Sequence, residues 1–311
     1  MSSVEVNKLH TLTGHNDCVY TLEPAALPQQ FFSAAGDGMV ALWDMQNPEL
    51  GKLIARLPNS IYALHYHKAS GLLVVGHNYE GIHVIDWQGQ KEIASLKLTD
   101  AAIFDIKAKG NTLFVADGSG IVHVLDFANL KLLTRIKASE KSARSLAISE
   151  KLNELAVGYS DHSFRIFSLD DLQLKFEIAA HQNSVFSLTY TPDEQFLLSS
   201  SRDARIKLWD AAAAYSLLNE VVAHMYAINH LYFSADGKHF VTCSMDKSIK
   251  VWDAASMKLL KVIDKSRHAG HGTSVNKLYW SSFNNYLVSA SDDRSISLWD
   301  IQFNKHQHAP N

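Results

Sequence analysis

Cysteine and proline are scarce in this chain, with two cysteines and six prolines among 311 residues. Cys18 and Cys243 lie too far apart in the sequence to indicate a framework of disulfides or a C-x-x-C metal or redox site. Such sparing use of cysteine is typical of proteins from a reducing compartment. The expected location is therefore the cytoplasm, with the nucleus left open.

Two further absences limit the range of partners. No apolar run reaches 18 residues, and the N-terminal segment 1–10 lacks a basic stretch followed by an apolar one. Neither secretion nor a membrane partner is expected. An excess of one charge is also lacking, because 29 lysines and arginines stand against 32 aspartates and glutamates, for a net charge of −3. Nucleic-acid binding needs a broad positive field, so nucleic acid is not an expected partner.

Apolar residues, by contrast, are abundant. The chain is 47% hydrophobic and 10% aromatic, which is enough for a continuous core and too much for a disordered chain. Because 311 residues exceed the usual size of one hydrophobic core, we expect two domains, one domain built from repeats, or one large barrel.

A repeated pattern favours the second arrangement. Four segments end in a strand-like run closed by Trp-Asp, and three more end in a similar run without Trp; the runs are 39–44, 205–210, 248–253 and 295–300, then 82–86, 122–126 and 164–168. The seven units end near residues 44, 86, 126, 168, 210, 253 and 300. The steps between them are 40 to 43 residues, except the last, which is 47. A period of this length indicates a repeat architecture.

Each unit contains four short apolar runs separated by polar turns. In the fifth unit the runs are 174–178, 185–190, 195–200 and 205–209. Runs of about five residues rich in β-branched and aromatic side chains are typical of strands, and turn clusters such as 191–194 separate them. The sequence therefore predicts a four-stranded meander in every unit.

Four residue types recur in register in the first, fifth, sixth and seventh units. A His stands 28 residues before the Trp, a hydroxyl residue ten before it and an Asp six before it. The four sets are His15, Ser33, Asp37 and Trp43; His181, Ser199, Asp203 and Trp209; His224, Thr242, Asp246 and Trp252; and His271, Ser289, Asp293 and Trp299.

With the Gly14-His15 dipeptide and the terminal Trp-Asp pairs, this pattern resembles the WD40-repeat family over essentially the whole chain. The resemblance implies an all-β fold: a closed seven-bladed propeller over residues 1–301, with four antiparallel strands per blade and a polar tail at 302–311. It also implies that each His, Ser or Thr, Asp and Trp set forms a hydrogen-bonded tetrad, in which neighbours satisfy the buried carboxylate.

The second, third and fourth units depart from this pattern. They have no His at the matching position, and Ile85, Leu125 and Phe167 replace the Trp. We expect these blades to depend more on apolar packing.

Segment 4–13 precedes the first tetrad His and has no blade of its own. In the family it resembles, each repeat begins with the outer strand of the preceding blade. We therefore predict that this segment pairs beside the strand ending at Trp299 and completes the seventh blade, which removes an exposed sheet edge.

Catalytic motifs are missing: there is no G-x-S-x-G, no phosphate-binding G-x-x-x-x-G-K-[ST], no H-E-x-x-H and no dinucleotide-binding G-x-G-x-x-G. The recurring His, Ser and Asp occur four times at identical spacing, which is typical of a structural repeat and not of a single catalytic triad. We predict a protein that is not an enzyme and needs no cofactor.

The 16 histidines raise the question of a metal site. His65 and His67 stand two apart on a predicted strand, so they share one face, but His67 aligns with the start of a turn in other units and is interpreted as solvated. His83 and His123 occupy equivalent positions in adjacent units, close enough in the repeat to approach each other. Without a nearby Cys or a fixed carboxylate partner, no metal site is predicted.

One aligned position is the main candidate for partner binding. It lies 23 residues before the Trp position, or 21 in the third unit, and by the resemblance it lies near the mouth of the central channel. Its occupants are Tyr20, Tyr62, Phe104, Arg144, Phe186, Asn229 and Asn276. Such aromatic and Arg residues are typical of interface hot spots, but the aromatic ones are equally expected in a core between blades. Arg144 favours binding, because a core does not accommodate an unpaired guanidinium.

The residues just before the turn Asp lie on the same face by the same resemblance, and they include Arg202, Met245 and Asp292. The insertion 265–269 in the last step adds positive charge there. Two arginines beside an aromatic arc favour a partner segment with an acidic or phosphorylated side chain. We predict a non-catalytic scaffold or adaptor that binds a protein or peptide as a monomeric propeller within a larger complex. The alternative is a propeller that holds a small ligand, or an enzyme site, in its channel.

Overall fold

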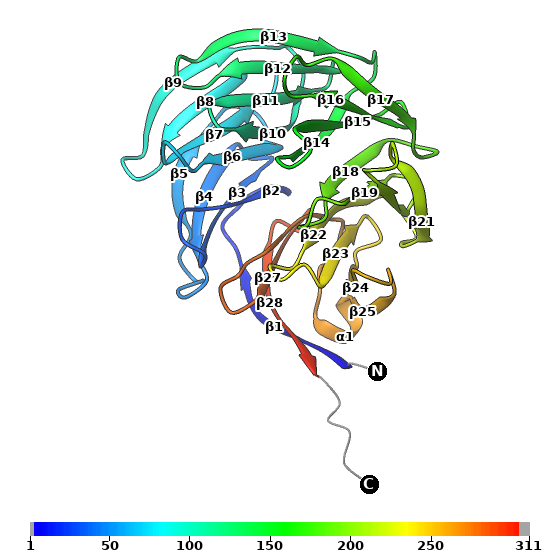
Figure 1. Ribbon diagram of the computed structural model, residues 1–311. Coiled ribbons are helices and arrows are strands. Elements are labelled where there is room, and N and C mark those ends of the chain that lie inside the picture. The colour runs from blue at the N-terminus through cyan, green and yellow to red at the C-terminus, as the bar shows by residue number, and fades with distance from the viewer. Residues whose placement is uncertain (1–2, 305–311) are drawn as a thin grey trace.

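The computed structural model describes residues 3–304. These residues form seven sheets of four antiparallel strands each, which follow one another around a central channel (Figure 1). The fold is the seven-bladed all-β propeller that the sequence predicts, and the described residues contain one short helix, α1 (Lys265–His268).

The first four blades take their strands in chain order, from the innermost strand to the outermost. Blade one consists of β2 (Val19–Pro24), β3 (Gln30–Ala35), β4 (Met39–Asp44) and β5 (Lys52–Arg56). Blade two consists of β6 (Ala63–His67), β7 (Leu72–His77), β8 (Gly81–Asp86) and β9 (Lys91–Lys97). Blade three consists of β10 (Ile103–Lys109), β11 (Thr112–Asp117), β12 (Ile121–Asp126) and β13 (Lys131–Lys137). Blade four consists of β14 (Ala143–Ser149), β15 (Glu154–Tyr159), β16 (Ser163–Ser168) and β17 (Leu174–Ala179).

The next two blades follow the same order, and the last blade takes its outer strand from the other end of the chain. Blade five consists of β18 (Val185–Tyr190), β19 (Phe196–Ser201), β20 (Arg205–Asp210) and β21 (Ser216–Val222). Blade six consists of β22 (Ile228–Phe233), β23 (His239–Ser244), β24 (Ile249–Asp253) and β25 (Leu259–Ile263). Blade seven consists of β26 (Val275–Trp280), β27 (Tyr286–Ser291), β28 (Ile296–Asn304) and β1 (Ser3–Leu12).

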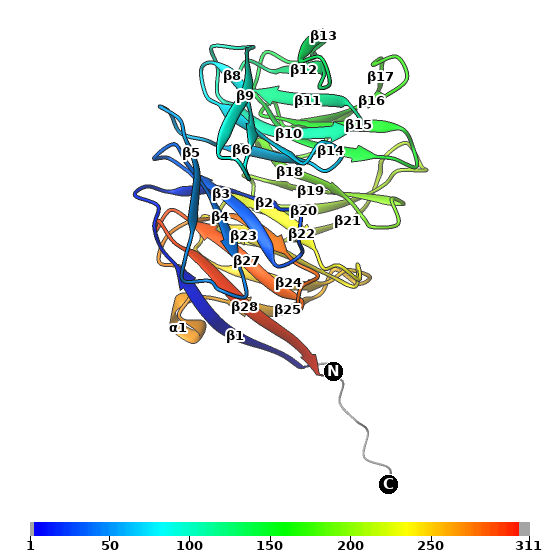
Figure 2. The same ribbon diagram turned by 90° about the vertical axis from the view of Figure 1, so that its left-hand side faces the viewer.

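Closure of the ring follows the prediction. β1 pairs antiparallel with β28, from Val4 opposite Phe303 to Leu12 opposite Ile296, and the two strands run side by side in both views (Figures 1 and 2). β28 runs to Asn304, past the residue 301 at which the sequence interpretation ended the propeller. The rest of the predicted tail, 305–311, lies outside the described residues.

The hydrophobic core lies between the blades. Between blades one and two, for example, Phe32 and Val40 pack with Ile61 and Leu73, all without exposed surface. The second strands of the blades, such as β7 and β11, are almost unbroken runs of buried residues, because each blade buries both of its faces against its neighbours. Each blade is thus held by the two beside it, and the last packs on the first.

The innermost strand of six blades carries a β-bulge at the same place. In blade one, Val19 pairs with Ala35 and Thr21 pairs with Ala34, so Tyr20 is an extra residue without a partner in β3. Equivalent register shifts occur at Phe104, Arg144, Phe186, Asn229 and Asn276. In blade two, β6 begins directly after Tyr62. A bulge redirects the extra side chain, and here it turns each of these side chains toward the channel opening.

Candidate functional site

The predicted tetrads are hydrogen-bonded relays in the structure. In blade five, Trp209 Nε1–H donates to Ser199 Oγ at 2.8 Å, and this hydroxyl lies 2.8 Å from His181 Nε2. His181 Nδ1 lies 2.9 Å from Asp203 Oδ2. Burial alone raises the pKa of Asp203, but the hydrogen bonds from His181 and the Gln182 amide outweigh it and bring the value down to about 2. A charged carboxylate therefore ends the relay of blade five at neutral pH.

The other three tetrads repeat this geometry in blades one, six and seven. Their His Nε2 to hydroxyl distances are 2.7 Å for His15 and Ser33, 2.8 Å for His224 and Thr242, and 2.8 Å for His271 and Ser289. Their indole donors lie 2.7 to 2.9 Å from the same hydroxyls, from Trp43, Trp252 and Trp299. Their His Nδ1 to carboxylate distances are 2.8 Å for Asp246 and Asp293 and 3.4 Å for Asp37. The hydroxyl groups of all four tetrads are completely buried, and the tetrads stabilise the blades.

Blades two to four have no tetrad, and the prediction that they depend more on apolar packing stays a prediction. Each contains a polar pair at one shared register, across the middle two strands: His77 and His83 in blade two, Asp117 and His123 in blade three, and Tyr159 and Arg165 in blade four. His83 and His123 thus bond within their own blades and not to each other. The residue types of these pairs differ from blade to blade, so no repeated residue in the sequence marks them.

The interpretation of His67 as a solvated turn residue is wrong. Its side chain is buried, with Nε2 at 2.9 Å from the Gly110 carbonyl oxygen of blade three and Nδ1 at 2.9 Å from Ser70 Oγ. His67 therefore ties two blades together, and His65 lies apart from it in the channel.

The seven candidate binding residues form a ring, which we call the mouth ring, around one opening of the channel: Tyr20, Tyr62, Phe104, Arg144, Phe186, Asn229 and Asn276. All seven are partly exposed. Tyr20 contacts Tyr62 edge-on with ring centroids 4.7 Å apart, and Tyr62 stacks on Phe104 at 5.8 Å. The aromatic side chains pack on each other along the rim and keep part of their surface open to a ligand.

Arg144 is the charged member of the mouth ring. Its guanidinium lies 4.0 Å from the centre of the Phe104 ring and 5.4 Å from that of Phe186, and its Nε donates to Ser160 Oγ at 3.1 Å. Within residues 3–304 no carboxylate lies within ion-pair distance of it. Burial, with the nearby charge of Arg202, lowers the pKa of Arg144. The side chain is a partly desolvated cation with free donors, which is a favourable anchor for an anionic group.

The two asparagines of the mouth ring have a structural role. Asn229 Nδ2 donates to the Val275 carbonyl oxygen of the next blade at 2.8 Å, and Asn276 Nδ2 donates to that of Val19 at 3.0 Å. Asn276 also donates to Asp292 at 2.7 Å. These bonds join blade six to seven and seven to one, so Asn229, Asn276 and Asp292 hold the rim together where aromatic packing is missing.

An exposed apolar patch on the same face was only partly predicted. Met225, Tyr226 and Met245 are 81%, 61% and 51% exposed, and we call them the blade-six patch. The Met245 amide donates to the Ala227 carbonyl oxygen at 3.0 Å, which holds the two loops together. Sequence reasoning found Met245 but missed the other two. The sequence does mark Met225 and Tyr226 as unusual. The two residues after the tetrad His are polar in blades one and five, Asn16-Asp17 and Gln182-Asn183, but apolar or aromatic in blade six.

Charged side chains gather inside the channel, where the sequence indicated only scattered histidines. A cavity of about 580 Å³ is lined by residues of the inner strands, among them His65, Asp105, Lys107, His230 and Lys277. The repeat could have indicated this cluster, because each of these residues follows the mouth-ring residue of its own blade by one or three positions.

Several of these channel groups have a clear structural task. An innermost strand has a free edge whose amides need partners. Glu23 accepts the Tyr66 amide at 3.0 Å, Asp105 accepts the Leu146 amide at 2.8 Å, and His230 Nδ1 accepts the Leu278 amide at 3.3 Å. Each bond links one blade to the next.

The burial of His65 gives a pH prediction. Burial, with the charge of Lys107 and the neighbouring His67, lowers the pKa of His65 from 6.5 to about 3. As the pH falls, the unfolded chain therefore binds a proton at His65 before the folded chain does. The contribution of the neutral His65 to the free energy of unfolding is complete above pH 6.5 and declines as the pH falls toward 3. We expect the fall in the free energy of unfolding over this range to be shallower in His65→Gln, by up to about 1.4 kcal/mol per pH unit. Urea titrations at several pH values measure it; His10→Gln, at an exposed site on β1, is the control, and equal slopes in wild type and His65→Gln would contradict the prediction.

Comparison with known proteins agrees with this architecture. The family model described as WD domain, G-beta repeat matches residues 6–44, 172–210, 215–253 and 262–300, which together cover half of the chain. The chain belongs to the WD40-repeat family. The matched segments include the four complete tetrads, and the three unmatched blades are those with substitute polar pairs.

Individual relatives are distant. The chain is 28% identical over 115 residues to an uncharacterized WD repeat-containing protein of Schizosaccharomyces pombe, covering 37% of this chain and 28% of that protein. It is 21% identical over 248 residues to the striatin homolog of Dictyostelium discoideum, covering 68% of this chain and 30% of that protein. It is 23% identical over 201 residues to Topless-related protein 4 of Arabidopsis thaliana, covering 61% of this chain and 16% of that protein. The chain thus spans less than a third of each relative, and the family supports a protein-interaction scaffold in general terms.

No helix within residues 3–304 is long and apolar enough to cross a membrane.

Proposed function

We propose that this propeller is a non-catalytic adaptor that captures a segment of a protein partner on the face around the mouth ring. One observation carries the proposal: a partly exposed aromatic rim with an unpaired Arg144 lies on the same face as the apolar blade-six patch. Exposed apolar clusters on a folded surface mark interaction sites, and aromatic and Arg side chains dominate binding energies.

The chemistry of this face suits a partner segment of mixed character. Met225 and Met245 have flexible, polarisable side chains that adapt to an apolar anchor. Arg144 and the exposed Arg202 are close enough for the charge of Arg202 to lower the pKa of Arg144, and they form a positive region at the aromatic rim. We infer an extended peptide with an apolar residue on the blade-six patch and an acidic or phosphorylated side chain at the arginines. The propeller would act as a monomer within a larger assembly in the cytoplasm, where its two free cysteines stay reduced.

Affinity capture from a lysate of the source organism, read by mass spectrometry, tests the adaptor role. One chain combines Tyr62→Ala, Phe104→Ala, Arg144→Ala and Phe186→Ala, and a second combines Met225→Ser, Tyr226→Ser and Met245→Ser. The matched control changes Leu217 and Leu218, exposed apolar residues of outer strand β21, to Ser. We expect the control to keep the partner and both face variants to lose it. A hot spot of about 2 kcal/mol corresponds to a partner affinity at least about 30-fold lower in the variant.

Thermal melting must first show that each variant is folded. Equal capture by all chains would place the interface elsewhere on the propeller. Loss of partner capture only in the β21 control would place the interface at the outer edge of the blades. Absence of any specific partner would favour the channel as a small-ligand site. Retained binding by Arg144→Glu with Arg202→Glu would exclude an anionic partner group.

A further inference from the structure

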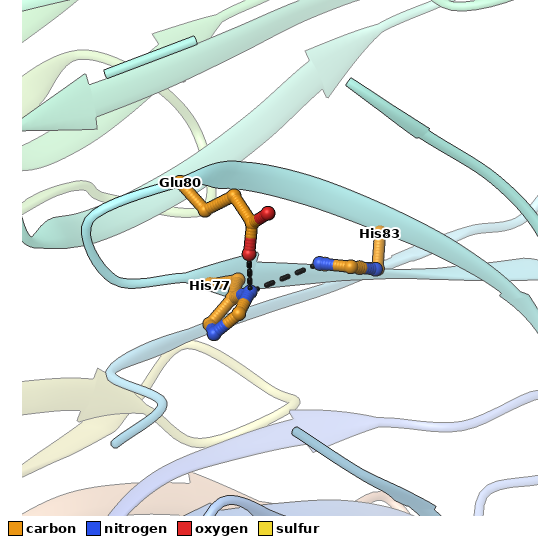
Figure 3. Close-up of side chains that lie close together, drawn as sticks. All are labelled: His77, Glu80 and His83. Atoms are coloured by element: carbon orange, nitrogen blue, oxygen red, sulfur yellow. Dashed lines mark hydrogen bonds and ion pairs between the residues drawn. The ribbon is translucent and has the colours of Figure 1, made fainter. Parts of the chain in front are cut away.

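Three side chains that can coordinate a metal ion lie close together at the β7–β8 hairpin of blade two. His77 Nδ1 lies 2.7 Å from Glu80 Oε2 and 3.0 Å from His83 Nε2 (Figure 3). The three atoms lie within 4.8 Å of one another. His77 ends β7, Glu80 lies in the turn and His83 is in β8, so one hairpin positions all three.

The outer nitrogens of both imidazoles have partners of their own. His83 Nδ1 lies 3.0 Å from Glu92 Oε2, so it donates its proton to this carboxylate and leaves a lone pair on Nε2. His77 Nε2 lies 3.4 Å from the side-chain amide of Asn59. The contacting atom is the amide nitrogen Nδ2, which also lies 3.4 Å from the Asn78 carbonyl oxygen, so the amide donates to His77 Nε2 and the imidazole proton of His77 is on Nδ1. The Glu80 carboxylate and the lone pair of His83 Nε2 both face this proton, which a bound metal ion would displace.

We propose that His77, Glu80 and His83 bind a divalent transition-metal ion of the zinc type. Two imidazole nitrogens and a carboxylate oxygen are a ligand set that Zn²⁺ prefers, and a site with three protein ligands leaves the fourth position open. The hydrogen bond from His83 to Glu92 is the carboxylate–histidine contact that orients metal-bound imidazoles.

The spacing of the ligands fits this ion after a small movement. With metal–ligand bonds of about 2.0–2.2 Å, tetrahedral ligands lie roughly 3.3–3.5 Å apart, so the side chains must separate by about half an ångström. His77 is held by burial, whereas the side chain of Glu80 is 53% exposed and is free to make this adjustment.

The neighbouring blades supply an internal comparison. At the same register blade three has Asp117, Gly120 and His123, which offers two ligands in place of three. The carboxylate of Asp117 is already used, because it accepts bonds from Ser119, the Ile121 amide and His123. The pair in blade three is a complete structural contact, whereas the cluster in blade two brings together three groups that can each coordinate a metal ion.

The site lies near the proposed binding face without depending on it. Tyr79, directly before Glu80 in the turn, is 60% exposed and lines the channel opening beside the mouth ring. An ion bound at this hairpin would therefore lie one residue from a side chain of that face.

Metal binding by the purified chain, freed of metal with a chelator, tests the proposal. Zn²⁺ is titrated by calorimetry, and Co²⁺ is followed by the visible absorption that reports tetrahedral coordination. We expect one equivalent to bind saturably, Glu80→Gln and His83→Gln to weaken binding at least tenfold, and Glu92→Gln to weaken it about 10- to 100-fold. His123→Gln, at the matching position of blade three, should leave binding unchanged.

Two further chains make the outcome decisive. His306 and His308 lie outside the described residues, and His306→Gln with His308→Gln separates any contribution from them. Glu80→Gln changes an exposed side chain, so its melting temperature without metal should equal that of the wild type. Absence of saturable binding, or binding that survives both Glu80→Gln and His83→Gln, would overturn the proposal. Failure of partner capture would not affect it.

Discussion

A chain shortened by residues 1–13 is expected to aggregate or to lose cooperative unfolding, because its last blade would have three strands and an open edge. β1 pairs with β28 from Ser3 to Leu12 and supplies buried side chains to two blade interfaces. Val4 packs with Trp299 and residues of blade six, and Leu12 packs with residues of blade one. The truncation therefore exposes backbone donors and acceptors of β28 together with apolar surface on both sides.

Point substitutions separate pairing from chain length. Val4→Asp and Leu12→Asp each put a charge into an apolar interface, and each is expected to lower the free energy of unfolding by roughly 3 kcal/mol or more. Glu5→Lys is the control, since Glu5 is exposed on the same strand. Denaturant titration and light scattering report the two effects. Unchanged melting of the truncated chain would mean that β1 does not hold the ring closed.

Ser199→Ala is the second substitution with a large expected effect, a loss of roughly 2–4 kcal/mol in the free energy of unfolding. Its hydroxyl accepts from Trp209 Nε1–H and donates to His181 Nε2. Alanine leaves both nitrogens buried without a partner, and each such group costs about 1–3 kcal/mol. The His181 and Asp203 pair would remain in place without the link to the indole.

Ser200 offers a closely matched control for this experiment. It is the next residue on β19, it is also completely buried, and within the described residues its Oγ has no hydrogen-bond partner. Ser200→Ala removes the same atom without breaking a bond, so a change of no more than about 0.5 kcal/mol is expected. Equal losses at both positions, in denaturant titrations under the same conditions, would show that the tetrad bonds do not contribute and that only packing matters.

Much of the fold could be predicted because the repeat has identical letters at fixed spacing. The Trp at the end of each third strand and the His 28 residues before it located blades one, five, six and seven. The surplus segment before His15 then indicated the closing strand. A periodic pattern reports which residues occupy equivalent places, and a closed ring of equivalent units follows from it.

The interior of the channel and the weaker blades could not be predicted in this way. The contact of Asp105 with the Leu146 amide joins a side chain to a backbone group, and backbone groups leave no trace in the sequence. The pairs His77–His83 and Tyr159–Arg165 share a register but no residue type. Such pairs become visible only when strand pairing fixes which positions lie diagonally across a sheet.

The repeated bulge at the mouth ring has an evolutionary consequence. A residue such as Tyr20 is surplus to the pairing of β2 with β3, so its side chain is chosen by neither the sheet nor the core. Six blades carry such a position, and four of these, Tyr20, Phe104, Arg144 and Phe186, can change one at a time while the blades keep their register. Substitutions there give a lineage a way to exchange one binding specificity for another on an unaltered scaffold.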